Sequence, residues 1–155
     1  MKFDPNRPLP ATARDVAVLV GRMLLGVVMF AHGYQKMMIN GIGRTTDGFE
    51  SLSIPLAIIS ASFVTVVEFV GGVLLILGGL TTVVCGLMTV IMIGAAVFVH
   101  IPKGIFLAGG GWELVGVITV GLVTIAAVGP GRFSLDHLVR GLQERHLREL
   151  AMASR

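Results

Sequence analysis

Four long apolar stretches constrain the fold of this chain more than any other feature of its sequence. They cover residues 16–38, 55–77, 80–101 and 112–128 and are 23, 23, 22 and 17 residues long. A helix needs about 20 apolar residues, within a range of about 17 to 25, to cross the hydrocarbon core of a bilayer. Strands are much shorter, and Pro, Gly or charged residues stand at the ends of these stretches rather than in their middles. The sequence therefore predicts an all-α membrane protein, a bundle of four transmembrane helices.

The composition agrees with a chain whose main solvent is lipid. Of its 155 residues 54% are hydrophobic and only 14% are charged, whereas soluble domains carry about 25% charged residues. The 21 glycines favour close packing between helices. The single cysteine, Cys85, excludes an intramolecular disulfide and an iron–sulfur cluster held by this chain alone, and we expect no metal site.

The distribution of lysine and arginine predicts the orientation in the membrane. Four spans place both termini on one side, and that side carries eight basic residues against three on the other. The eight are Lys2, Arg7, Arg14, Arg132, Arg140, Arg145, Arg148 and Arg155, and the three are Lys36, Arg44 and Lys103. Positive residues favour the cytosolic side, so both termini are expected in the cytosol. Since the basic residues flank membrane spans, we expect no nucleic-acid partner.

The segments outside the spans divide the chain into three parts. Residues 1–13, which contain three prolines, are expected to form an extended cytosolic arm, and residues 14–131 the transmembrane domain. Residues 39–54 would form a long outer loop with an amphipathic patch that caps the membrane. Residues 132–155 form a basic tail, in which Ser134 can cap an amphipathic helix. That helix would either rest on anionic headgroups or bind a cytosolic partner.

Ionisable residues inside the apolar stretches are the first candidates for function, because charges at membrane depth are costly. Arg22 lies six residues into the first stretch, about 9 Å from the inner face, and Glu68 lies about 13 Å from the same face. A guanidinium can span that offset. We therefore expect an intramembrane ion pair between Arg22 and Glu68, which serves either helix register or proton and ligand chemistry.

A second group of polar residues is expected near the outer face. It consists of His32, Lys36, His100, Trp112 and Glu113. An imidazole beside a carboxylate could bind a quinone carbonyl, relay its proton or ligate a metal, although interfacial histidines are often packing residues. We take these five residues as a candidate quinone or proton site and expect no intrinsic cofactor.

Several short motifs resemble the DoxX family of membrane proteins. They are Gly21–Gly26 (GRMLLG), Phe30–Lys36 (FAHGYQK), Phe49–Pro55 (FESLSIP), Glu68–Gly72 (EFVGG), His100–Gly104 (HIPKG) and Gly129–Arg132 (GPGR). The resemblance runs from about Val16 to Asp136. It implies a four-helix inner-membrane protein, with relatives described as a subunit of thiosulfate:quinone oxidoreductase or linked to oxidative-stress complexes. The family pattern falls on Arg22, His32, Gly33, Lys36, Glu68, Gly72 and His100.

These observations leave three functional hypotheses. The first is a membrane subunit of a quinone-linked oxidoreductase or oxidative-stress redox complex, in which other subunits supply the redox centre. The alternative is a non-catalytic scaffold that recruits cytosolic redox enzymes through its basic C-terminal helix. The third, a small solute or proton carrier, is disfavoured because four short-looped helices leave little room for alternating access, although a homo-oligomer would supply more.

Overall fold

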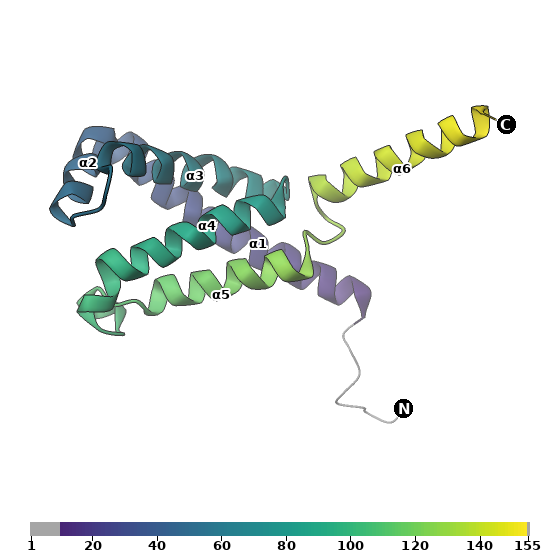
Figure 1. Cartoon of the computed structure of the whole chain (residues 1–155). Coiled ribbons are helices and arrows are strands. Elements are labelled where there is room, and N and C mark those ends of the chain that lie inside the picture. Colours follow the sequence, from purple (N-terminus) through teal and green to yellow (C-terminus); the bar gives the residue numbers. More distant parts are fainter. Residues whose placement is uncertain (1–9, 155) are drawn as a thin grey trace, which may run out of the picture.

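A computed structural model describes residues 10–154, in which every regular element is a helix. The α-helices are α1 (Ala11–Tyr34), α2 (Gly41–Ser51), α3 (Ala57–Leu77), α4 (Thr81–Ala95), α5 (Glu113–Val128) and α6 (Leu135–Ala153). Two π-helical segments, η1 (Gln35–Asn40) and η2 (Ala96–His100), extend α1 and α4, and two short 3-10 turns, η3 (Ile101–Lys103) and η4 (Leu107–Gly109), lie between η2 and α5. Figure 1 shows α1, α3, α4 and α5 running together as a bundle.

Three helical stretches are long and apolar enough to cross a membrane. They are Ala11–Ser51, Ala57–Leu77 and Thr81–Lys103, whereas Glu113–Val128 is apolar but shorter. At about 1.5 Å per residue, the 16 residues of α5 extend about 24 Å, less than the roughly 30 Å of a typical hydrocarbon core. The all-helical membrane fold is thus confirmed, and the fourth span stays a prediction.

The region between the first two spans is helical, whereas the sequence had predicted a loop over residues 39–54. The chain passes from η1 into α2 at Gly41, whose φ of +75° is a left-handed conformation that glycine adopts without strain. The Thr45 hydroxyl donates a hydrogen bond of 2.9 Å to the Gly41 carbonyl oxygen in the first turn of α2. The helix α2 contacts α3 and lies at one end of the bundle (Figure 1).

The closest helix contact in the bundle joins α1 and α3, and it depends on glycines. A Cβ at Gly33 would meet the backbone of Phe69, and a Cβ at Gly72 would meet the backbone of Phe30. Phe30 and Phe69 stack across this contact with ring centroids 4.9 Å apart. Small residues let helices approach closely in lipid, where no hydrophobic effect drives them together.

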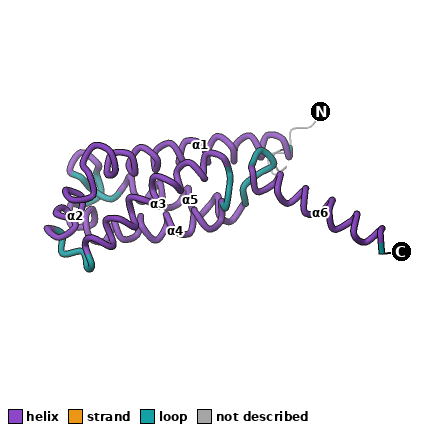
Figure 2. Tube along the Cα trace, turned by 90° about the horizontal axis from the view of Figure 1, so that it is seen from above, coloured by secondary structure: helices purple, strands orange, loops and turns teal. Residues whose placement is uncertain are grey.

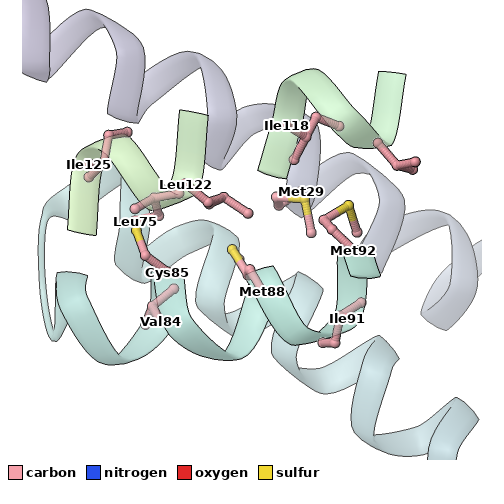
Figure 3. Packing of buried hydrophobic residues seen from close by; sticks show 11 residues of the cluster. Met29, Leu75, Val84, Cys85, Met88, Ile91, Met92, Ile118, Leu122 and Ile125 are labelled. Atoms are coloured by element: carbon pink, nitrogen blue, oxygen red, sulfur yellow. The ribbon is translucent and has the colours of Figure 1, made fainter. Parts of the chain in front are cut away.

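The buried core is formed mainly by α4 and α5, with contributions from α1 and α3. Figure 3 shows Met29, Leu75, Cys85, Met88 and Leu122 among the side chains that fill it, and each of these five is fully buried. The Cys85 thiol is therefore enclosed by packed apolar groups. Many other apolar side chains face outward, as expected for a surface covered by lipid.

The C-terminal helix α6 leaves the bundle from the end at which α1 begins, as both overall views show (Figures 1 and 2). Ser134 caps it as predicted, since its hydroxyl accepts a hydrogen bond from the His137 N–H. The Asp136 carboxylate in turn accepts bonds of 2.7 and 2.8 Å from the backbone N–H groups of Leu80 and Thr81. The first turn of α6 is thus fastened to the start of α4. Of the expected N-terminal arm, residues 11–13 belong to α1, and residues 1–9 lie outside the described residues.

Candidate functional site

Glu68 forms an ion pair with Lys36 in the interior of the bundle. The Lys36 ammonium donates a hydrogen bond of 2.5 Å to Glu68 Oε2, and the side chains are 21% and 4% exposed. Glu68 lies in the middle of α3 and Lys36 in the π-helical segment η1. The pair therefore compensates a carboxylate that would be costly to bury alone.

The expected pair between Arg22 and Glu68 is not formed, because the register of α1 against α3 separates the two residues. Gly33 packs against the backbone of Phe69 and Glu68, which brings Lys36, one turn later, to the level of Glu68. Arg22 lies eleven residues before Gly33, about 16 Å along the helix, and packs against Gly78 at the end of α3. The sequence argument failed because it counted depth from the ends of the apolar stretches rather than from the helix crossing.

Arg22 instead links α1 to the segment that precedes α6. Its Nη2 donates a hydrogen bond of 2.6 Å to the carbonyl oxygen of Phe133. The residue is 1% exposed, and within the described part of the chain its Nε and Nη1 have no hydrogen-bond partner. The guanidinium thus holds the junction between the bundle and α6 and takes no part in the Glu68 site.

A cavity of about 340 Å³ adjoins the ion pair, and we call it the Lys36 cavity. Its walls are mostly apolar side chains of α3, α4, η2 and the α2 region, among them Phe49, Phe63, Val64, Ile91 and Phe98. The polar groups at its surface come from Lys36, Glu68, Ser60 and His100. An apolar pocket with a few convergent polar groups is the usual form of a small-molecule site.

His100 reaches this cavity from the end of η2 with its imidazole held in place. The ring Nδ1 lies 2.7 Å from the carbonyl oxygen of Gly110. Because a carbonyl oxygen only accepts, Nδ1 carries the hydrogen, and Nε2 of the neutral ring is left as an acceptor. The loop containing Gly110 thereby fixes the tautomer of a cavity residue.

The structure divides the five residues of the predicted outer site. Lys36 and His100 line the Lys36 cavity, whereas Trp112 and Glu113 line a separate hollow on α5 together with Ile105. The Glu113 carboxylate accepts a hydrogen bond from the Leu107 N–H and so fastens the preceding loop. His32 is exposed on α1 and lines neither hollow. The sequence argument grouped residues by depth, which does not say which helix faces they occupy.

Several cavity residues were missed by sequence reasoning. Glu68 was assigned to another partner. Phe63, Gly94 and Phe98 gave no signal, because in the sequence an apolar residue that lines a cavity looks the same as one that faces lipid. One signal was present. The amphipathic pattern around Phe49 and Ile54 marked a segment with an apolar face, and both residues line the cavity.

Comparison with known proteins identifies the family. Residues 17–101 match the DoxX family, and this range contains Lys36, Glu68 and every other residue that lines the Lys36 cavity. The chain belongs to the DoxX family. The resemblance seen in the sequence motifs is thus confirmed, and the family region includes the ion pair that the structure places at the cavity.

Two relatives of this DoxX protein carry limited functional information. One is the "Uncharacterized membrane protein Rv3486" of Mycobacterium tuberculosis, 35% identical over 77% of this chain and 79% of its own length. Another is the "Putative oxidoreductase CatD" of Bacillus subtilis, 27% identical over 81% of this chain and 88% of its own length. No solved structure matches the chain.

Proposed function

We propose that this DoxX protein is a membrane subunit of a quinone-linked oxidoreductase complex and that the Lys36 cavity binds the quinone. In this proposal the protein lies in the cytoplasmic membrane with α5 as a fourth span and both termini in the cytosol. Other subunits supply the electron carrier. The name of the Bacillus subtilis relative supports the assignment to oxidoreductases, and the cavity supports the choice of ligand.

The observation that carries the proposal is the combination of an apolar cavity with a buried ammonium–carboxylate pair and an oriented imidazole. A quinone has an apolar ring and tail and two carbonyl oxygens that only accept hydrogen bonds. Its ring suits the phenylalanine-rich walls, and its carbonyls require donors at the cavity surface. Lys36 is such a donor, because an ammonium has three N–H groups and its bond to Glu68 uses one of them.

The chain's own residues would bind the ligand and exchange protons with it. Reduction of a quinone to a quinol takes up two electrons and two protons. Glu68 and His100 flank Lys36 in the cavity, and a carboxylate and an imidazole are side chains that serve in proton transfer at active sites. The Gly110 carbonyl holds the His100 ring so that Nε2 is its proton-accepting atom.

The decisive experiment fills the cavity without touching its charges. Gly94 lines the cavity, and open space lies within 4 Å of the position that its Cβ would occupy. Gly86 lies on the same helix, also with open space around its Cβ, but it does not line the cavity. The protein is purified in mild detergent from native membranes, and quinone in the lipid extract is quantified by mass spectrometry.

The proposal predicts that Gly94→Leu loses co-purified quinone at unchanged protein yield. Gly86→Leu and His32→Ala should retain it at the level of the unsubstituted protein. Absence of quinone from the unsubstituted protein, or equal retention by Gly94→Leu and Gly86→Leu, would contradict the proposal. The His32 variant also separates the structural assignment from the sequence-based one, which placed His32 in the site.

One observation favours a second function, that of a scaffold for cytosolic redox enzymes. The helix α6 projects from the bundle (Figures 1 and 2), and its apolar residues Leu138, Val139 and Leu142 are exposed. A chain that ends at His137 keeps the Asp136 cap and removes the rest of α6, including the exposed residues Leu138, Val139 and Leu142. Under the scaffold function this truncation releases co-purifying redox enzymes and leaves bound quinone unchanged, and undiminished co-purification would exclude that function.

A further inference from the structure

A second cavity, of about 330 Å³, lies at the end of the bundle opposite the Lys36 cavity, where α1 begins and α5 ends. We call it the arginine pocket. Its ionisable lining consists of Arg14, Asp15, Arg132, His137 and Arg140. These residues come from the start of α1, the turn between α5 and α6, and the first turns of α6, so three separate segments converge on one hollow.

The arginine pocket carries an excess of positive charge that the described residues do not neutralise. Its three arginines face one carboxylate, that of Asp15, and Asp15 is itself buried with 6% of its surface exposed. Within residues 10–154 the Lys36–Glu68 pair is the only ion pair closer than 4 Å. The guanidinium groups of the pocket therefore keep donors available for an anion, and an arginine fork matches the geometry of a phosphate.

The fold fixes the position of these side chains. Asp136 fastens the start of α6 to α4, and Arg22 holds the Phe133 carbonyl from α1. His137 and Arg140 follow Asp136 by one and four residues, so they are carried on a helical turn that is bonded at its base. The pocket is thus a built feature of the junction between the bundle and α6.

The location of the pocket indicates where its ligand comes from. Its apolar lining includes Val18 and Val128, and Val128 is the last residue of the apolar helix α5. Basic residues lie just beyond this point. The pocket therefore spans the boundary at which apolar helix surface gives way to charged surface, the depth of lipid headgroups.

We propose that the arginine pocket binds the phosphate group of an anionic phospholipid, with the acyl chains lying against α1 and α5 beside Val18 and Val128. Basic pockets between helix ends at the cytoplasmic side recognise anionic headgroups. This site is separate from the Lys36 cavity, and the proposal does not depend on quinone binding. A bound lipid would join α1, the turn after α5 and α6, and so would stabilise the junction.

The test compares lipids on the full-length protein in detergent. Phosphatidylglycerol, phosphatidylcholine or inorganic phosphate is added at equal concentration, and binding is followed by native mass spectrometry and by the thermal unfolding temperature. Phosphatidylglycerol should remain bound and raise that temperature, whereas phosphatidylcholine should do neither. Inorganic phosphate that binds as tightly as phosphatidylglycerol would overturn the assignment to a lipid.

Matched arginine variants locate the site. Arg132→Gln/Arg140→Gln removes two pocket charges, and Arg145→Gln/Arg148→Gln removes two exposed charges from α6 outside the pocket. Each arginine near an anionic surface strengthens binding about fivefold, so the loss of two should weaken phosphatidylglycerol binding by at least about tenfold. The control variant should change it less than about threefold. Equal loss in both variants would mean attraction by the whole helix and would overturn the pocket.

A change at Asp15 provides an independent check, because it should strengthen lipid binding where the arginine changes weaken it. It is the only carboxylate that lines the pocket among the described residues, so Asp15→Asn should tighten phosphatidylglycerol binding. Weaker binding by a folded Asp15→Asn protein, judged by an unchanged unfolding temperature without lipid, would contradict the proposal.

Discussion

The Asp136 carboxylate caps a helix to which it does not belong, since it accepts a hydrogen bond of 2.8 Å from the backbone N–H of Thr81, the first residue of α4. Burial alone would raise the pKa of Asp136. The hydrogen bonds from Thr81 and Leu80 and the charge of Arg22 outweigh that effect and hold the pKa below its ordinary value of 3.8. A carboxylate at a helix N-terminus also interacts favourably with the helix dipole.

This cap makes the stability of the junction depend on pH in a defined direction. Because the folded-state pKa is depressed, the unfolded chain binds the proton more tightly. The stabilisation is therefore complete above the ordinary pKa and is lost as the pH falls through the lower pKa of the folded state. Asp136→Asn removes the charge and one of the two acceptor oxygens, so it should lower the free energy of unfolding by about 1 kcal/mol at neutral pH.

The measurement is detergent unfolding of Asp136→Asn and the unsubstituted protein between pH 7 and acid. The difference in the free energy of unfolding between the two proteins should shrink once the pH falls below about 4. Asp47→Asn, which changes an exposed carboxylate on α2, should leave the unfolding temperature unchanged at neutral pH. A stability difference that stays constant into acid would contradict the role of the Asp136 charge.

The contact between α1 and α3 predicts which glycines accept a methyl group. Gly33→Ala and Gly72→Ala place a Cβ against backbone atoms of the opposing helix, which can yield only if the helices separate. Each should lower the free energy of unfolding by about 1 to 3 kcal/mol. Gly21→Ala on α1 has open space around its Cβ, so it should be neutral or stabilising. Equal melting temperatures for Gly33→Ala and Gly21→Ala would refute this contact.

The loop before α5 provides a prediction that contrasts with the sequence-based site. The Glu113 carboxylate holds the Leu107 N–H, and Glu113 does not line the Lys36 cavity. Glu113→Ala should release the loop at a local cost of about 1 kcal/mol and speed amide hydrogen exchange there about fivefold. Co-purified quinone should be unchanged. If Glu113→Ala instead loses quinone and amide hydrogen exchange in the loop is not faster, Glu113 contributes to the quinone site and not to the loop.

The helical fold could be read from the sequence because length and hydropathy determine it almost alone. Apolar stretches of the length of residues 55–77 have no other stable form in a bilayer, and α3 occupies Ala57–Leu77. The helix α2 was harder to predict. Its residues have mixed polarity, and its contact with α3 follows the left-handed backbone conformation at Gly41, where α2 begins.

The sequence could predict the approximate depth of the site residues in the membrane, but not which of them face each other. The second property depends on the register between neighbouring helices. Lys36 and His100, which the sequence argument placed in one outer group, line one cavity. The partner of Glu68 depended on where Gly33 meets α3, a contact between segments far apart in the sequence. With that contact known, the spacing of three residues from Gly33 to Lys36 identifies the partner.

The Lys36–Glu68 pair gives a prediction in which two changes do less harm than one. Removing either partner leaves a buried charge, so Lys36→Met or Glu68→Leu alone should lower the free energy of unfolding by about 3 kcal/mol. The double variant removes both charges and fills the space with apolar atoms, so it should be more stable than either single variant by about 1 kcal/mol or more.

Unfolding in detergent of the four proteins forms a double-mutant cycle that measures the coupling between Lys36 and Glu68. Arg44→Met, which removes an exposed cation from α2, serves as the control for loss of a positive charge and should change the free energy of unfolding by less than about 0.5 kcal/mol. Additive losses in the double variant would mean that the two charges do not stabilise each other. If the pair is merely structural, the double variant, whose apolar side chains restore the fold, should still bind quinone. A favourable coupling energy together with loss of quinone in the double variant would show that the pair both stabilises the bundle and forms the polar wall of the cavity.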